Sequence, residues 1–502
     1  MNSLMNEIKF VDTTLRDGQA SLWAENMRTG MMLLVAERID NAGFEAIEVM
    51  AASHVKKCVR ELREDPFERI RLLAQKIKKT TLRALGAARI SPFELTPDSV
   101  MELWFERMLA NGIRQLRISD AANDSASWRK SVERAKRVGL GTVVNLTFSV
   151  SPKHSDEYYA RKAREAAALH PDFVCLKDPG GLLTPERTAV LVPVIQQNAP
   201  GIPFDLHTHC TTGLGPLCAL EAIKLGVEIV DTAVPPLANA SSNPSIFNVA
   251  MNARALGYTP LIDEESLVPV ARDLEFIAKR EGFPIGAPVE YDYSQYVHQV
   301  PGGMISNLRF QLKNLGLLHR LEEVLEEAVR VRADLGYPIM VTPFSQFVGS
   351  QAAINVIQGE RYKQVTDQVL QYALGHWGEE AADEVDANIK DKFLDRPRAK
   401  EFAKWQPPQP SLEEVRAKLG GPGVGDDELL MRYVVGKDDV EAMRAASGPR
   451  EYLSASKPLL ALLENLTRRA DCHQIYIQKN GLSVTLEKRA DSAIGSREER
   501  SA

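Results

Sequence analysis

Residues 173–209, FVCLKDPGGLLTPERTAVLVPVIQQNAPGIPFDLHTH, contain one complete strand–helix–strand unit. The short apolar runs at its two ends, FVCLKDP and PFDLHTH, are typical of buried strands. The stretch TPERTAVLVPVIQQNAP between them has the pattern of an amphipathic helix. Two strands joined through a helix run parallel. The segment therefore predicts a parallel sheet that is covered by helices.

The first 280 residues repeat this alternation eight times. The strand candidates, in chain order, are IKFVDTT, AIEVMAA, LRALGAA, QLRISDA, TVVNLTF, FVCLKDP, PFDLHTH and IVDTAVP. Eight such units in about 270 residues predict an α/β fold of the (β/α)8 TIM barrel type. The alternative, an open doubly wound sheet, places a G-x-G-x-x-G turn after its first strand, and the sequence has none there.

The pattern changes near residue 285, where strand-like runs give way to helical ones. ISNLRFQLKNLG, LHRLEEVLEEAVRVRADLG and GSQAAINVIQG all show helical periodicity. We therefore expect a barrel domain over residues 1–285 and a mainly helical C-terminal domain over residues 286–450. The proline-rich WQPPQP at 405–410 is expected to act as a hinge before a last helical piece, 411–445.

The end of the chain has a different composition. HQIYIQKNGLSVTLEK consists of two alternating runs around Asn480-Gly481, which predicts a β-hairpin. We expect a small segment containing this hairpin over residues 451–490. The charged, small-residue end, residues 491–502, is expected to be a disordered tail.

Composition excludes several classes of protein. With 44% hydrophobic and 25% charged residues and a net charge of −6, the chain is typical of soluble globular proteins rather than nucleic-acid binders. No apolar stretch approaches the roughly 18 residues of a membrane span, and the start MNSLMNEIKF does not resemble a signal peptide. Its five cysteines include no C-x-x-C pair. We therefore expect a cytoplasmic protein with reduced thiols and no nucleic-acid partner.

Possible metal ligands lie at the ends of separate apolar runs. His207 and His209 are two residues apart on a predicted strand, so their imidazoles share one face and can bind one ion. Two satisfied core histidines would give the same pattern. Asp17 and Lys177 at equivalent positions of other units favour a metal site, because chemistry in this fold takes place at the C-terminal ends of the strands.

Seven motifs support a family resemblance. They are DTTLRDG, LRISDAAND, LKDPGGLL, DLHTHCTTG, VPGGMISNL, RVRADLGYPIMVTPFSQFVGSQAAINV and GPGVGDDELL, in order from about residue 8 to 435. The chain resembles the carboxyltransferase subunit shared by pyruvate carboxylase, the transcarboxylase central subunit and oxaloacetate decarboxylase. This resemblance implies a barrel that holds a divalent metal and a helical domain that forms a funnel over its mouth. It also implies that carboxybiotin on a carrier gives its CO2 to an enolisable substrate.

The resemblance also implies roles for individual residues. Asp17, His207 and His209 would bind zinc or manganese, and Lys177, as a carbamate, would be the fourth ligand. A salt bridge between Lys177 and Asp178 is the alternative.

The catalytic residues that the resemblance implies lie in other loops. Arg117 would hold the substrate carboxylate or ketone oxygen. Asp120 and Asn123 would orient Arg117, unless they only cap a helix. Ser241 stands where the family has a proton-relaying threonine, and its alternative role is that of an ordinary polar loop residue.

The pocket residues depart from the family pattern. The family's substrate-binding stretch R-D-A-H-Q-S is RDGQAS here, so Arg16 is kept, Gln19 is one residue short and Ala20 replaces the glutamine. W-G-G-A-T-F-D becomes MAASHVK at residues 50–56, and the arginine of L-L-R-G is replaced within LGAARI. These changes predict a bulkier or less polar acceptor than pyruvate.

The main hypothesis is a carboxyltransferase subunit that moves CO2 between carboxybiotin and an oxo acid or related small carbonyl compound. The biotin-acceptor tetrapeptide A-M-K-M is absent from the chain, so we expect a separate biotin carrier protein and a biotin carboxylase subunit as partners. A homodimer is expected from the resemblance. Two alternatives are a biotin-independent metal lyase or aldolase of the hydroxymethylglutaryl lyase-like group and a weakly catalytic structural subunit.

Overall fold

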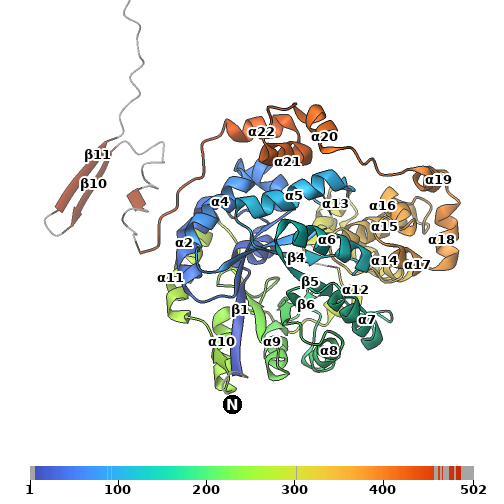
Figure 1. Ribbon diagram of the computed structural model, residues 1–502, viewed down its shortest axis with the longest axis horizontal. Helices are drawn as coiled ribbons and strands as arrows, with labels where there is room; N and C mark the ends of the chain where they lie inside the picture. Colours follow the sequence, from blue (N-terminus) through green and yellow to red (C-terminus); the bar gives the residue numbers. More distant parts are fainter. Residues whose placement is uncertain are drawn as a thin grey trace, which may run out of the picture. The chain divides into compact units, whose positions relative to one another are not determined.

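Eight short parallel strands close into a barrel (Figure 1). The computed structural model describes residues 6–456 except 88, 92 and 301, and beyond them residues 459, 462, 463, 466, 474–479 and 482–487. Residues 1–450 and 451–502 form two compact units. The barrel strands are β1 Glu7–Asp12, β2 Ala46–Ala51, β3 Thr81–Ala87, β4 Gln115–Ser119, β5 Gly141–Thr147, β6 Phe173–Asp178, β7 Phe204–Thr208 and β8 Ile229–Thr232. Because β1 pairs with both β8 and β2, the predicted barrel is confirmed and the open sheet is wrong.

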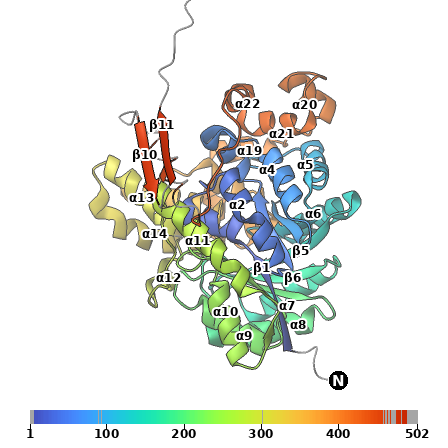
Figure 2. The same ribbon diagram turned by 90° about the vertical axis from the view of Figure 1, so that its left-hand side faces the viewer.

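Helices follow the strands and cover the barrel. They are α2 Thr29–Asn41, α3 His54–Lys57, η3 Cys58–Leu62, α4 Pro66–Lys76, α5 Asp98–Asn111, α6 Ser125–Val138, α7 Asp156–Ala167, α8 Pro185–Asn198, α9 Gly215–Lys224 and α10 Ile246–Ala255. Helix α8 begins where Thr184 accepts a hydrogen bond from the Arg187 amide at 3.1 Å, just before Pro185. A short strand, β9 Thr259–Pro260, pairs with β1, and α11 Glu264–Glu281 packs against α2 (Figure 2).

The turn after β1 differs from the simple strand end that the sequence suggests. A π-helical turn, η2 Thr14–Gly18, leads into α1 Gln19–Trp23, so Asp17 lies five residues beyond the end of β1. A side chain at Gly18 would place its Cβ 2.7 Å from the carbonyl oxygen of Leu237. Only glycine allows this close approach, which fixes the turn against the loop after β8.

The part of the chain after α11 is helical. Its elements are α12 Ser294–His298, α13 Gly302–Asn314, η4 Leu318–Arg320, α14 Leu321–Asp334, α15 Phe344–Gln358, α16 Asp367–Ala373, α17 Glu379–Asp383, α18 Ala387–Leu394 and α19 Pro397–Lys404. Phe344, Phe347 and Tyr372 pack together in its core with ring centroids 5.3–5.4 Å apart. Ala121 and Ala122, just beyond β4, pack against this core. The helical part therefore lies over one side of the barrel mouth.

The boundaries predicted from the sequence fall in non-helical chain. Residue 285 lies between α11 and α12, and residues 405–410 lie between α19 and α20 Leu412–Leu419. The last two helices of this unit, α21 Asp426–Val435 and α22 Lys437–Arg444, return to the barrel (Figure 1). Asp427 of α21 binds Arg71 at 2.6 Å and Arg107 at 2.7 Å, on α4 and α5.

The second unit contains an antiparallel pair, β10 Gln474–Lys479 and β11 Leu482–Glu487, in which Lys479 pairs with Leu482. These are the two strands of the predicted hairpin. Its turn residues Asn480 and Gly481, and the predicted tail 491–502, lie outside the described residues. None of the helices in the described part of the chain is both long and apolar enough to cross a membrane.

Candidate functional site

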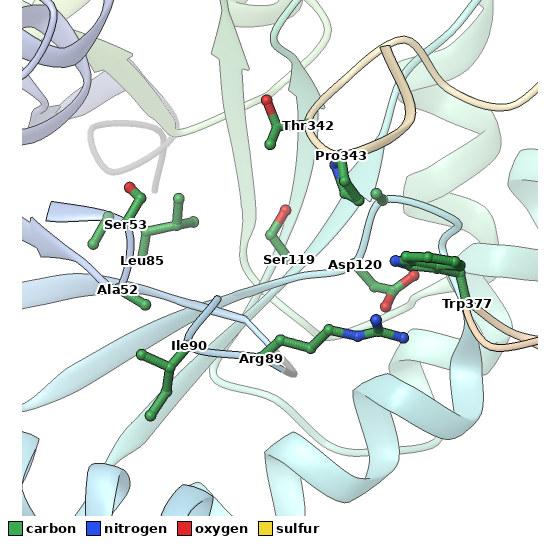
Figure 3. A pocket seen from close by; sticks show the side chains of 12 residues that line it. Ala52, Ser53, Leu85, Arg89, Ile90, Ser119, Asp120, Thr342, Pro343 and Trp377 are labelled. Atoms are coloured by element: carbon green, nitrogen blue, oxygen red, sulfur yellow. The ribbon is translucent and has the colours of Figure 1, made fainter. Parts of the chain in front are cut away.

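A cavity of about 220 Å³ lies where the barrel mouth meets the helical part (Figure 3). One wall is formed at the ends of β2, β3 and β4, and the other comes from the segments before α15 and α17. The lining residues are Ala51, Ala52, Ser53, Leu85, Arg89, Ile90, Ser119, Asp120, Ala121, Thr342, Pro343 and Trp377. Ala51 and Ala52, from the altered stretch MAASHVK, line the cavity, whereas Met50 is buried and is not one of the lining residues.

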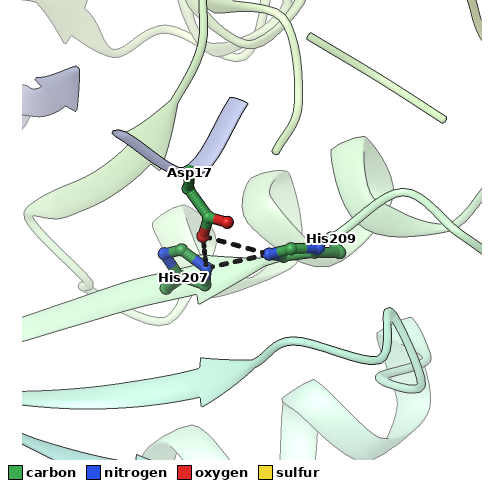
Figure 4. A group of neighbouring side chains, drawn as sticks. All are labelled: Asp17, His207 and His209. Carbon is green, nitrogen blue, oxygen red and sulfur yellow. Dashed lines mark hydrogen bonds and ion pairs between the residues drawn. The ribbon is translucent and has the colours of Figure 1, made fainter. Parts of the chain in front are cut away.

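Three buried ligand atoms converge on the other side of the mouth (Figure 4). Asp17 Oδ2 lies 2.9 Å from His207 Nε2 and 3.2 Å from His209 Nε2. The two Nε2 atoms are 3.1 Å apart. Asp17 comes from η2, and the two histidines come from β7 and the residue just beyond it. The structure thus brings together three of the four ligands expected from the sequence.

The partners of the other ring nitrogens determine the chemistry of this cluster. His209 Nδ1 lies 2.7 Å from the carbonyl oxygen of Ser241, which can only accept, so Nδ1 carries the proton. His207 Nδ1 lies 2.5 Å from Asp231 Oδ2 in the same way. Both Nε2 atoms then present lone pairs to each other and to the Asp17 carboxylate. Three electron-pair donors at this spacing repel one another unless a cation lies between them, so the residues fit a divalent metal.

A chain of buried ion pairs connects two of the ligands through the barrel interior. Arg117 binds Asp231 at 2.8 Å and also binds Glu48. Glu48 in turn binds Arg16, and Arg16 binds Asp17 at 3.1 Å. These ion pairs therefore connect the Nδ1 atom of His207 to the carboxylate of Asp17. The connection runs through Asp231, Arg117, Glu48 and Arg16.

The protonation states suit metal binding. Burial alone would raise the pKa of Asp17, but Arg16 and the two imidazoles outweigh it, so the pKa lies well below its usual range. Burial lowers the pKa of His207 to about 3. The carboxylate is therefore charged and the imidazole neutral at physiological pH, which are the forms that bind metals.

Lys177 lies beside this cluster, since it pairs with His207 in the register between β6 and β7. Its side chain is buried, and among the described residues none forms a hydrogen bond or ion pair with its amine. Asp178 instead accepts hydrogen bonds from the Leu182 and Leu183 amides and from Thr208. The alternative Lys177–Asp178 salt bridge is thus not seen. Burial and Arg16 lower the pKa of Lys177 to about 8, which favours the neutral amine that reacts with CO2.

Arg117 is bound by acidic side chains in the barrel interior. Its guanidinium is fully buried, where it binds Glu48, Asp205 and Asp231 and lies 2.9 Å from Cys175 Sγ. Its contact with substrate stays a prediction. Its observed contacts position His207 through Asp231.

Asp120 and Asn123 bind backbone groups around the loop after β4, whereas the side chain that caps α6 is that of Asp124. Asp120 Oδ1 accepts from the amides of Ala122 at 2.8 Å and Asp124 at 3.1 Å. Asn123 is buried and exchanges hydrogen bonds with the backbone of Thr147. Asp120 also lines the cavity, so a role toward a ligand remains compatible with its place.

The remaining predicted site residues lie on α1 and in the loop after β8. The Ser241 hydroxyl donates to the Ser21 carbonyl at 3.0 Å, while its own carbonyl binds His209. Gln19 is buried with its Nε2 atom lacking a partner, and Ala20 follows it on α1 as a half-buried residue. Arg89 and Trp377 were not among the residues predicted for the site, although Arg89 belongs to LGAARI, the stretch in which the family's arginine is replaced.

Two family models match the chain. The model described as HMGL-like matches residues 7–274, and the conserved carboxylase domain matches residues 296–457. The first covers the barrel strands and their helices, and the second covers the helical part.

Several relatives have a similar sequence. A pyruvate carboxylase subunit of Methanocaldococcus jannaschii is 39% identical over 436 residues, which cover 85% of this chain and 76% of the relative. The 2-oxoglutarate carboxylase large subunit of Hydrogenobacter thermophilus is 32% identical over 84% of this chain and 61% of its own length. The methylmalonyl-CoA carboxyltransferase 5S subunit of Propionibacterium freudenreichii is 29% identical, with 86% of each chain covered.

A solved structure has the same fold. The carboxyl transferase domain of Rhizobium etli pyruvate carboxylase, solved with pyruvate, superposes with a TM-score of 0.79 at 23% identity. The match covers 98% of this chain and 86% of that one. At this identity the likeness concerns the fold alone.

Proposed function

The chain belongs to the carboxyltransferase family of biotin-dependent carboxylases, and from this premise we propose that it transfers CO2 between carboxybiotin on a partner's carrier and an enolisable oxo acid. The observation that supports this most directly is the buried convergence of Asp17, His207 and His209 at the barrel mouth, under a helical part that matches the conserved carboxylase domain.

The alternatives are less well supported. A biotin-independent lyase or aldolase would explain the HMGL-like match to the barrel but not the match of residues 296–457 to a carboxylase domain. A structural subunit without activity has no need for three metal-ligand atoms held by buried partners. The carboxyltransferase therefore remains the best explanation of both parts of the chain.

The site residues would divide the chemistry as follows. Asp17, His207 and His209, with Lys177 as a carbamate, would hold zinc or manganese. When bound, the metal supplies a Lewis acid that polarises the substrate carbonyl and favours its enolate. Asp231 and the Ser241 carbonyl hold the two imidazoles in orientation. In a proton relay the Ser241 hydroxyl would release the Ser21 carbonyl, accept a proton on its oxygen and pass on the proton that it already carries.

Partners follow from the reaction. Carboxybiotin would be supplied by a biotin carrier protein that is recharged by a biotin carboxylase subunit, as expected for a relative of a single subunit of a pyruvate carboxylase.

We also propose a homodimer, as the family resemblance suggests. Light scattering at micromolar concentration should give the mass of a dimer, and a strict monomer would contradict this part.

The reaction can be tested with purified components. The chain, loaded with zinc or manganese, is mixed with a carboxylated biotin carrier and an oxo acid, and loss of CO2 from the carrier is followed. We expect transfer only with metal, carrier and oxo acid all present, and none by His209→Ala. Transfer that persists after chelation of the metal, or no transfer with any oxo acid, would contradict the proposal.

A further inference from the structure

Ser21 contacts Asp17 on the side of the carboxylate that faces away from the imidazoles. Asp17 directs one oxygen, Oδ2, toward His207 and His209 (Figure 4). The other oxygen, Oδ1, accepts a hydrogen bond from the hydroxyl of Ser21, and the two oxygens are 3.2 Å apart. The two imidazoles are held in a similar way, through partners of their Nδ1 atoms. Ser21 is thus the corresponding partner of the third ligand.

The short helix α1 explains why Ser21 reaches this oxygen. Ser21 follows Asp17 by four residues, and residues at this spacing share one face of a helix. The turn η2 leads directly into α1, so the helical chain runs without a break from Asp17 to Ser21. The indole nitrogen of Trp23, the last residue of α1, donates to the carbonyl oxygen of Pro284 at 2.9 Å, and its ring lies 4.8 Å from that of Phe283. The helix that bears Ser21 is therefore anchored.

The backbone of Ser21 makes a second connection. Helix α1 has only five residues, so the carbonyl groups near its end lack the usual helical partner four residues on. The amide of Glu25, which a longer helix would direct to Ser21, donates instead to the carbonyl oxygen of Gln19. The carbonyl oxygen of Ser21 accepts from the hydroxyl of Ser241 at 3.0 Å. This bond joins α1 to the loop after β8.

Together these contacts form a continuous path between two of the ligands. His209 Nδ1 donates to the carbonyl oxygen of Ser241 at 2.7 Å. The Ser241 hydroxyl donates to the Ser21 carbonyl, and the Ser21 hydroxyl donates to Asp17 Oδ1. At the ends of the path, Asp17 Oδ2 and His209 Nε2 are 3.2 Å apart. Ser241 is exposed and Ser21 is half-buried, so this path lies at the mouth rather than in the barrel interior.

A nearby arginine makes the contact with Ser21 important. Arg16 lies 3.1 Å from Asp17 Oδ2, and its guanidinium has the geometry to bind both oxygens of a carboxylate. If the Ser21 hydroxyl is lost, the Asp17 carboxylate can turn toward Arg16. It would then present Oδ2 less well to the space between the two imidazoles.

We propose that Ser21 is a positioning residue: its hydroxyl orients Asp17 for metal binding, and its carbonyl connects Asp17 to Ser241. The inference rests on the proposed function, in which Asp17 binds the metal and Ser241 relays a proton. Loss of the partner of a metal ligand typically lowers metal affinity by about ten- to a hundredfold. Because Ser21 is only half-buried, we expect a loss at the lower end of this range.

Metal binding tests this without a carrier or an acceptor. Each variant is titrated with zinc against a chromophoric chelator and is then saturated with Co2+, whose visible absorption depends on the geometry of its ligands. We expect Ser21→Ala to bind zinc about tenfold more weakly than wild type and to have a changed cobalt spectrum. Ser21→Thr keeps the hydroxyl and should restore both properties.

Ser294→Ala is the matched control. Ser294 also donates to a carboxylate, that of Asp292 at 2.6 Å, and Asp292 is not one of the three clustered ligands. The control should behave as wild type. If Ser21→Ala behaves as this control does, or if Ser21→Thr is no better than Ser21→Ala, the inference is wrong.

A double-mutant cycle tests the connection to Ser241. Ser241→Ala removes the hydroxyl that binds the Ser21 carbonyl and keeps the carbonyl that binds His209. We expect it to weaken zinc binding by less than Ser21→Ala does, and to have little further effect when both changes are combined. Effects that simply add would show that the two serines act independently and that Ser241 is not connected to Asp17 through Ser21.

The two proposals can fail separately. If Ser21→Ala weakens metal binding but the wild-type chain shows no carrier-dependent CO2 transfer, the proposed function is wrong and the positioning role stands. If transfer occurs but Ser21→Ala binds metal as wild type does, the function stands and the inference is wrong. If Ser21→Ala does not fold by circular dichroism, Ser21→Cys replaces it, because a thiol is a weak donor of similar size. Wild-type affinity in that variant would overturn the inference.

Discussion

Each imidazole at the barrel mouth is oriented by the partner of its Nδ1 atom. Asp231 holds His207, and the Ser241 carbonyl holds His209. The sequence could predict the two histidines from their spacing of two, because alternate residues of a strand share a face. It could not predict Asp231 as a partner, because a contact between neighbouring strands depends on their register.

Asp231→Asn should weaken the metal site. Asparagine can still accept from His207, but it turns an amide donor toward Arg117 and lacks the negative charge. We expect the affinity for zinc to fall about ten- to a hundredfold, as measured by competition with a chromophoric chelator. Asp205→Asn is a matched control, because Asp205 also binds Arg117 but has no contact with His207. Equal losses in the two variants would show that charge, not orientation, matters.

Lys177→Ala should also lose metal, because we expect the carbamate of Lys177 to supply an anionic oxygen ligand. The neutral amine that carbamylation requires is favoured by the lowered pKa of about 8. Elemental analysis of the purified protein should find one divalent ion per chain in wild type and much less in the variant. A wild-type protein without metal, or an alanine variant with full occupancy and activity, would contradict the carbamate.

His154 should make stability depend on pH. Burial lowers its pKa to about 3 from 6.5, with Arg332 and Lys153 adding to the effect, and Ser151 Oγ lies 2.6 Å from its Nδ1. Between these values the unfolded chain binds the extra proton, so stability is lost as pH falls, by up to about 1.4 kcal/mol per pH unit. In urea unfolding, His154→Asn should reduce the dependence between about pH 6 and pH 4 by this amount. An unchanged slope would show that His154 is not responsible.

At the scale of elements, the sequence predicts the regular structure well and the irregular turns poorly. The eight strands and helices such as α2 and α8 follow from apolar periodicity, which is a local property. The π-helical turn η2 does not, because it depends on the close approach of Gly18 to Leu237 from the loop after β8. The cavity cannot be predicted from local sequence for the same reason, because Arg89 and Trp377 meet only when the helical part packs on the barrel.

Gly18→Ala should disturb η2 and with it Asp17. The new Cβ would lie 2.7 Å from the Leu237 carbonyl oxygen and 3.2 Å from its Cβ, so the turn must shift. We expect a loss of about 1–3 kcal/mol in unfolding free energy, together with weaker metal binding. Gly423→Ala is the control, since nothing lies within 4 Å of a Cβ there. Stability and metal affinity like those of the control would mean that the turn adapts without moving Asp17.

At the scale of the whole molecule, function depends on the helical part staying over the barrel mouth, because the cavity takes one wall from each. Lys162 and Arg161 of α7 on the barrel both bind Glu380 of α17, each at 2.7 Å. Lys162 is fully buried, and Glu165 is its only other ion-pair partner in the described part of the chain. These contacts join α7 to α17, just beyond Trp377 in the sequence.

Glu380→Gln should therefore loosen the helical part. Lys162 and Arg161 hold the pKa of Glu380 at about 2 despite partial burial, so its contribution is fully present above 4.5 and is lost as pH falls toward 2. Since a third of the side chain is exposed, we expect a loss of only about 1–2 kcal/mol at neutral pH. Urea unfolding should show this difference at pH 7 and a smaller one below the ordinary glutamate pKa.

Hydrogen exchange measures the same change locally. In Glu380→Gln it should become faster than in wild type in α17 and stay unchanged in the barrel strands. Faster exchange throughout the chain would mean that the barrel and the helical part unfold together, and that this ion pair does not control the mouth.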